Sequence, residues 1–85
     1  MKLRILYFAG IREKLGVDTE EIDLPAGVAT VAALRAHLRA RGGAWGETLA
    51  EGKLLRAAVN QDMAQPAAAI KAGDEVAFFP PVTGG

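Results

Sequence analysis

The sequence contains no cysteine and only one histidine, His37. Without a thiol, the chain cannot by itself form a disulfide, use a thiolate nucleophile or bind a metal through sulfur. A single histidine cannot supply a His-based triad or a His-rich metal site, because both need further partners. We therefore expect no metal site in this chain, and we expect His37 at the surface or boundary of a helix.

Net charge and long apolar runs are also missing. Ten basic and ten acidic side chains cancel, so the chain lacks the clustered positive excess that binds nucleic acid or an anionic membrane. No segment approaches the roughly 20 apolar residues of a membrane span, and residues 1–3 lead into a strand-like pattern rather than a signal peptide. We expect a cytoplasmic protein with protein or small-molecule partners, no nucleic acid and no membrane.

The 85 residues suffice for one domain with a modest core. Hydrophobic periodicity and turn residues place the elements along the chain. The predicted elements are strands over residues 2–9, 17–24, 54–59 and 74–79, a polar connection over 11–16, a helix capped by Thr30 and running to about Arg41, a short helix over 44–50, and a turn at 60–62.

This order predicts an α+β fold, with a mixed sheet of four to five strands packed on one main helix plus a short helix. It permits the first and last strands to lie side by side in the middle of the sheet. Arg35, Arg39 and Arg41 are expected to form a solvated helix face, weighted toward the C-terminal end where the dipole favours cations. The predicted organisation is a domain over residues 1–79, followed by a flexible C-terminal Gly-Gly tail over 80–85.

The end of the sequence, Gly84-Gly85, makes the terminal carboxylate a candidate reactive group. Glycine has no Cβ, so a pair of glycines can enter a narrow channel and leave the last carbonyl open to attack. Pro80 and Pro81 fix φ and lack backbone donors, so they end the strand and direct the tail outward. Six residues reach roughly 20 Å at about 3.3 Å each. A frayed terminus without function would look the same, so the two glycines alone are weak evidence.

Alternation on the first and last strands predicts an apolar patch at the root of this tail. If Tyr7 and Phe78 face the helix, then Phe8 and Phe79 face outward. Met63, in the turn before the last strand, can join them, and an exposed apolar patch usually marks an interface. The patch depends on the parity, because a shift of one residue or a loop over the face would remove it.

Three segments carry a family resemblance: Leu6-Tyr7-Phe8-Ala9 with Ile11-Arg12-Glu13, then Gly52-Lys53-Leu54-Leu55 through Ala57-Ala58-Val59-Asn60-Gln61, and finally Gly73 to Gly85. Together they resemble the sulfur-carrying small subunit of molybdopterin synthase over essentially the whole chain. The Phe78-Phe79-Pro80-Pro81 lead-in is the most specific part. The thiamine-pathway carrier and ubiquitin-like modifiers share the fold and the terminal Gly-Gly but not this lead-in. The resemblance implies the ubiquitin-like β-grasp fold.

The resemblance also implies a mechanism. A partner adenylating enzyme would use ATP to convert the Gly85 carboxylate into an acyl-adenylate, and a sulfur donor protein would turn it into a thiocarboxylate. In a heterotetramer of two small and two large subunits, the tail would enter the large subunit and give sulfur to cyclic pyranopterin monophosphate, forming the molybdopterin dithiolene. The chain would bind no cofactor stably and would be a sulfur-donor subunit, with the active-site groups on the large subunit.

The resemblance assigns roles to particular residues. Gly85 carries the chemistry, the tail residues Gly84, Thr83, Val82 and Pro81 guide it, and the partner interface is formed by Phe8, Met63 and Phe79. Arg12 and Lys53 also match family positions, but a solvated surface role is expected for both.

Other classes of function remain open at this point. A ubiquitin-like modifier would use the same adenylation and end as a ladder of lysine-linked isopeptide adducts. A sulfur carrier for another pathway, such as thiamine synthesis or tRNA thiolation, would share the thiocarboxylate. A plain binding module would keep its binding after deletion of Gly84-Gly85.

Overall fold

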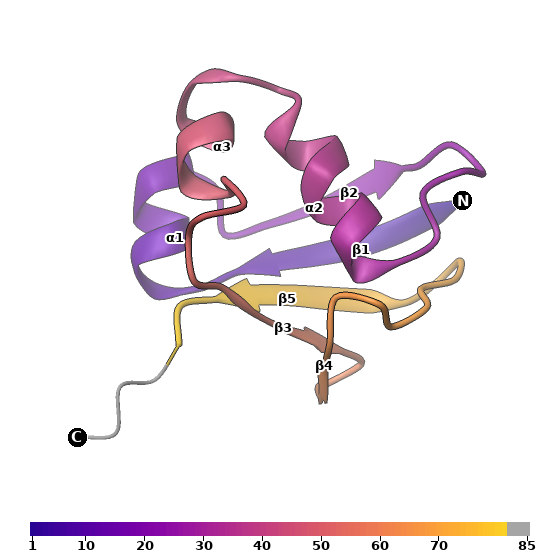
Figure 1. Cartoon of the computed structure of the whole chain (residues 1–85). Helices are drawn as coiled ribbons and strands as arrows, with labels where there is room; N and C mark the ends of the chain where they lie inside the picture. Colours follow the sequence, from indigo (N-terminus) through magenta and orange to yellow (C-terminus); the bar gives the residue numbers. More distant parts are fainter. Residues whose placement is uncertain (82–85) are drawn as a thin grey trace.

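The computed structural model describes residues 1–81. Its elements are β1 (Lys2–Tyr7), α1 (Ala9–Leu15), β2 (Thr19–Asp23), α2 (Val31–Arg39), α3 (Gly43–Thr48), β3 (Arg56–Val59), β4 (Asp62–Ala64) and β5 (Glu75–Phe79). Figure 1 shows one five-stranded sheet with the helices gathered on one face. The strand order is β2-β1-β5-β3-β4, with β1 and β5 parallel and the other neighbours antiparallel. The predicted mixed sheet, with its first and last strands adjacent in the middle, is confirmed.

The core lies between α2 and the facing side of β1 and β5. Ile5 and Val76 on the strands are fully buried, and so are Leu34 and Leu38 on α2. Alternate residues of a strand share a face, and residues three or four apart share a helix face, so the hydrophobic periodicity directs these side chains inward. Burial of each such side chain stabilises the fold by about 1.5–3 kcal/mol.

Helix α2 begins where the sequence predicts. The Thr30 hydroxyl oxygen accepts a hydrogen bond from the Ala33 N–H at 3.1 Å, which satisfies one free donor of the first turn. The helix ends at Arg39 rather than at about Arg41, and Gly42 and Gly43, with φ of 79° and 54°, turn the chain into α3. His37 is exposed, as expected. No helix within residues 1–81 is long and apolar enough to cross a membrane.

The prediction of a polar connection over residues 11–16 is wrong. Helix α1 occupies this segment, and strand β1 ends at Tyr7 instead of residue 9. In this seven-residue helix only Ile11 is buried, so the segment shows too little periodicity to be recognised. The domain therefore has three helices within its described part, one more than expected.

The turn predicted at 60–62 is shorter, and a fifth strand follows it. Val59 pairs with Asp62, which leaves Asn60 and Gln61 as a two-residue hairpin loop between β3 and β4. Both loop residues have positive φ, 50° and 71°, as the tightest hairpin turns require. Strand β4 has only three residues, too few for its alternation to be read from the sequence.

Candidate functional site

The root of the tail lies at the C-terminal end of β5. Because β1 and β5 are parallel neighbours, the end of β1 lies at the same edge of the sheet. The Phe8 N–H donates to the Phe78 carbonyl oxygen at 3.1 Å, which places Phe8 beside the last residues of β5. Pro80 and Pro81 follow β5, whereas the predicted tail residues Val82, Thr83, Gly84 and Gly85 lie outside the described residues. Their roles stay predictions.

The side chains around the tail root alternate as predicted. Tyr7 and Phe78 are each 1% exposed and face the helices, whereas Phe8 is 44% exposed. Phe79, next along β5 from Phe78, is half-buried on the outer side of the sheet. Met63 is 62% exposed on β4.

An apolar band connects Met63 to the aromatic pair. The strand register aligns Leu6, Ala77, Ala58 and Met63 in one row across β1, β5, β3 and β4. We call these four residues, together with Phe8 and Phe79, the outer-sheet patch. Small alanines in the middle leave the band flat, which suits contact with another protein surface.

Charge on the outer face is concentrated away from the tail root. Arg4 pairs in register with Glu21 on β2 and with Glu75 on β5, and its guanidinium lies 3.7 Å from the Glu21 carboxylate. The cluster around Arg4 therefore lies at the end of the outer face away from the tail, whereas the outer-sheet patch at the tail end has one charged neighbour, the exposed Arg56 in register with Phe79. A partner that contacts the patch also meets the tail.

A polar network supports the patch from the other side of the sheet. The Tyr7 hydroxyl donates to Glu20 at 2.8 Å, and both Glu20 oxygens accept hydrogen bonds from Arg41 at 3.0 Å. The Arg41 guanidinium lies 4.4 Å from the centre of the Trp45 ring, which contacts Tyr7 edge to face. Arg41 is exposed, as expected, but it is paired with Glu20 and Trp45 rather than surrounded by water alone. The network holds the end of β1, from which Phe8 projects, against β2 and the segment that leads into α3.

The charges in this network shift the pKa values of its members. Burial alone would raise the pKa of Glu20, but hydrogen bonds from Arg41 and Tyr7 outweigh it and hold this pKa below its usual range. Burial, and then the hydrogen bond to Glu20, raise the pKa of Tyr7 far above its usual value. Tyr7 therefore stays protonated and serves as a donor, which is a structural rather than a catalytic role.

Replacement of Glu20 with Gln tests this network. We expect the free energy of unfolding at neutral pH to fall by about 0.5–1 kcal/mol, because Arg41 loses its charged partner in a pair that water partly screens. A carboxyl group such as that of Glu20, whose pKa is lower in the folded than in the unfolded state, stabilises the fold at pH values above its unfolded pKa. This stabilisation is lost as the pH falls through the folded pKa. Urea unfolding at neutral pH and at about pH 3 should therefore show a smaller loss on acidification in E20Q than in the wild type.

The comparison isolates Glu20 because other carboxylates titrate in both proteins. The pKa of Asp74, for example, is also low, chiefly because Asn60 donates a hydrogen bond to it. An equal acid-induced loss of stability in the two proteins would contradict the assignment to Glu20.

Arg12 and Lys53 are exposed, on α1 and in the loop before β3 respectively. Lys53 lines a hollow that also contacts Pro80, whereas Arg12 lies outside it. The structure brings neither side chain into an ion pair within residues 1–81. Their expected surface roles stay predictions.

Leu54 is the residue that the sequence analysis missed. It was assigned to a strand over 54–59, but β3 begins at Arg56, and Leu54 is 81% exposed. Its neighbour Leu55 is half-buried and packs on the core. The sequence does contain a signal for the exposure of Leu54, namely the pair of adjacent leucines. Only one of two successive residues in an extended segment can face the core.

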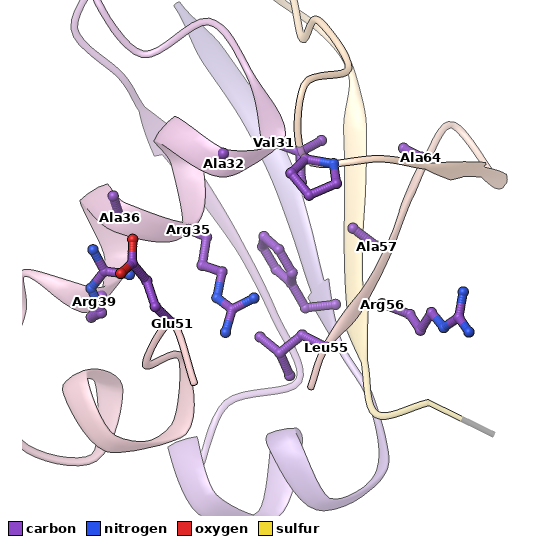
Figure 2. Close-up of a pocket in the computed structure, with 12 residues that line it drawn as sticks. Val31, Ala32, Arg35, Ala36, Arg39, Glu51, Leu55, Arg56, Ala57 and Ala64 are labelled. Carbon is purple, nitrogen blue, oxygen red and sulfur yellow. The ribbon is translucent and has the colours of Figure 1, made fainter. Parts of the chain in front are cut away.

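A groove of about 230 Å³ lies between α2 and β3, lined by Val31, Ala36, Leu55, Ala57 and Phe78 among others. In Figure 2, Arg35 extends from α2 into the same region. Its guanidinium donates to the carbonyl oxygens of Leu49, Ala50 and Lys53. The prediction of a solvated Arg35 is therefore wrong, because its guanidinium is bound by carbonyl oxygens. The same hydrogen bonds leave Arg35 unavailable to hold an anion.

The described residues also contain no metal-binding cluster. Within residues 1–81, no group of three or more His, Asp and Glu side chains is placed to hold a metal ion. The groove between α2 and β3 has a mixed lining, because Arg39, Glu51 and Arg56 border its apolar residues beside the structural Arg35. The arrangement that can serve function is the outer-sheet patch beside the tail root.

Comparison with known proteins identifies the family. Residues 5–85 match the model of the ThiS family. The molybdopterin synthase sulfur carrier subunit of Haemophilus influenzae is 49% identical over 83 residues, which are 98% of this chain and 99% of the relative.

Two solved structures are similar over nearly all of the chain. A putative molybdopterin converting factor subunit 1 from Pyrococcus furiosus has a TM-score of 0.78 and 33% identity, covering 96% of this chain and 99% of that chain. H. volcanii small archaeal modifier protein 1 has a TM-score of 0.74 and 27% identity, covering 95% and 98%. The expected ubiquitin-like β-grasp fold is thereby confirmed. The chain belongs to the ThiS family and is related over almost its whole length to a sulfur carrier subunit of molybdopterin synthase.

Proposed function

We propose that the chain is the sulfur carrier subunit of a molybdopterin synthase in the cytoplasm. The observation that carries this proposal is the outer-sheet patch beside the tail root, where Phe8, just after β1, is hydrogen-bonded to the residue before Phe79 on the parallel strand β5. A protein partner that binds the patch receives the tail in the same encounter. The relation to the H. influenzae carrier supports the molybdopterin pathway.

The chemistry begins with activation of Gly85. Its carboxylate attacks the α-phosphorus of ATP on an adenylating enzyme, and pyrophosphate leaves. A sulfide equivalent from a donor protein then attacks the acyl carbon, and AMP leaves, so a C–S bond replaces the C–O bond to phosphate. The product is a thiocarboxylate, a soft nucleophile at the end of a tether. Glycine at the last two positions leaves room for both enzymes to reach the carbonyl carbon.

Transfer then takes place in the large subunit. The six residues from Pro80 to Gly85 reach roughly 20 Å at about 3.3 Å each, so the thiocarboxylate can enter a pocket while the outer-sheet patch stays in contact. Insertion supplies proximity, and acid, base and anion-binding groups come from the large subunit. Cyclic pyranopterin monophosphate needs two sulfurs for its dithiolene, so two carriers or two rounds serve each product. Two small and two large subunits form the heterotetramer, and the carrier itself binds no cofactor stably.

Intact mass spectrometry tests the first step. The chain is incubated with its adenylating enzyme, ATP and a sulfide source, and we expect a mass shift equal to one oxygen exchanged for sulfur. Fragmentation should place the shift at Gly85, and omission of ATP should abolish it. An unchanged mass with an active adenylating enzyme would contradict the proposal.

A protein modifier is the second candidate function. It is favoured by the similarity to a structure described as a small archaeal modifier protein. In this case the adenylated Gly85 would form isopeptide bonds with lysine side chains of other proteins. Immunoblots of cells that express the tagged chain would then show a ladder of larger adducts that resist denaturation and thiols, instead of a thiocarboxylate.

A further inference from the structure

We propose that Leu54 is a second apolar anchor beside the tail root, buried by the large subunit when it receives the tail. This inference rests on the proposed function and names a contact outside the outer-sheet patch. This contact lies on the loop between α3 and β3 rather than on a strand of the sheet.

Leu54 lies next to the place where the tail begins. On one side it lines a hollow together with Met63 of the outer-sheet patch and Pro81 of the tail root. On its other side it lines a second hollow together with Ile11 and Pro80. The side chain therefore stands between two depressions that both reach the tail root, and the first of them is continuous with the patch.

The exposure of Leu54 is large for a leucine. At 81% it exceeds the exposure of Met63, 62%, and of Phe8, 44%, and no other large apolar side chain among residues 1–81 is as exposed. Water around such a side chain is released when a partner covers it. Leu54 lines one hollow with Pro81 and another with Pro80, so a partner that encloses the tail root also covers Leu54.

The loop that presents Leu54 is held in place before any partner binds. Arg35 on α2 donates to the carbonyl oxygens of Leu49 and Lys53 at 2.9 and 2.8 Å, and also to Ala50. Figure 2 shows Arg35 directed from α2 toward the segment that carries Leu55. Because the loop is already ordered, little backbone entropy is lost on binding. Most of the free energy of burying the side chain therefore contributes to affinity. Arg35 is thus a positioning residue for this anchor.

The full chain and the purified large subunit test the proposal by titration calorimetry. Leu54→Asp should raise the dissociation constant at least about tenfold, because the free energy of burying a leucine side chain corresponds to a tenfold or larger change in affinity. Leu54→Met should stay near the wild type, since it keeps an apolar side chain of similar volume. The matched control is Ala26→Asp, which places the same charge on an exposed residue of the loop between β2 and α2. Thermal unfolding checks that each variant remains folded.

A double-mutant cycle tests the role of Arg35. In an Arg35→Ala background the loop is free to move, so the change from Leu54 to Asp should weaken binding by a smaller factor than it does with Arg35 present. A purely structural arginine would lower the stability of the chain and leave that factor unchanged, which would overturn the positioning role.

The outcomes separate this inference from the proposed function. If the wild type binds the large subunit and Leu54→Asp binds equally well, the anchor is wrong and the proposed function stands. If the wild type does not bind at all, the proposed function fails and the anchor with it. If Leu54→Asp leaves that affinity unchanged but dissociates a dimer of the carrier in sedimentation, the occupant is a second copy of this chain, and the proposal is overturned.

Discussion

Deletion of Gly84-Gly85 is expected to abolish sulfur loading and sulfur transfer completely, while the thermal unfolding midpoint stays unchanged. Every described strand and helix ends at or before Phe79, so the core does not depend on the last two residues. The deletion moves the terminal carboxylate to Thr83, whose branched Cβ would have to enter a channel that glycine alone fits. The measurement is the mass shift after incubation with the adenylating enzyme, ATP and sulfide, followed by a single-turnover transfer assay.

One variant and one binding measurement serve as controls for this deletion. Gly84→Ala adds one methyl group next to the reacting residue and should slow loading without abolishing binding to the large subunit. Deletion of Gly84-Gly85 should likewise leave some affinity for the large subunit, because the outer-sheet patch remains, so the loss of sulfur loading rather than of binding distinguishes the carrier from a plain binding module. A thiocarboxylate on the shortened chain, formed at the wild-type rate, would show that the glycine pair is not required.

Replacement of Phe79 with Asp is expected to abolish co-purification with the large subunit. Phe79 lies on the outer face at the end of β5, next to the residue whose carbonyl oxygen binds the Phe8 N–H, within the contact that the proposed function requires. In the contact the new carboxylate loses its water, and pairing with the neighbouring Arg56 does not fully offset that desolvation, so binding should weaken more than about tenfold. The free variant should keep its fold, since Phe79 pairs in register with the exposed Arg56, which can compensate the new charge in water.

The controls for Phe79→Asp separate charge from position. Phe79→Leu keeps the contact apolar and should still co-purify, and Ala72→Asp places the same charge on an exposed turn before β5. Affinity pull-down with the tagged large subunit, quantified by titration calorimetry, compares the three. If Phe79→Asp co-purifies like the wild type, the outer-sheet patch is not the docking surface.

Local patterns carried much of the fold. The i, i+3 and i+7 spacing of Val31, Leu34 and Leu38 and the capping oxygen of Thr30 predicted α2, because a helix repeats its faces over a few residues. Alternation predicted β1 and β5 in the same way. Helix α1 and strand β4 were missed because each is shorter than the window in which a period can be recognised.

Contacts between distant segments were beyond local patterns. The pairing of Glu20 with Arg41 joins residues 21 positions apart, and the sequence analysis took that arginine for a solvated cation. Arg35 likewise binds the loop before β3 through the carbonyl oxygens of Leu49 and Lys53, which no side-chain pattern reveals.

By itself the sequence determined which groups are available: no thiol, one histidine, and a Gly-Gly end after two prolines. It also determined which strand residues face the core, because the period of a strand depends only on its own backbone. The tertiary structure alone decided that Phe8 lies next to the end of β5 and that Leu54 lines hollows shared with Pro80 and Pro81 at the tail root. The physical reason is that these are matters of strand pairing and loop packing, which bring together residues that are distant along the chain.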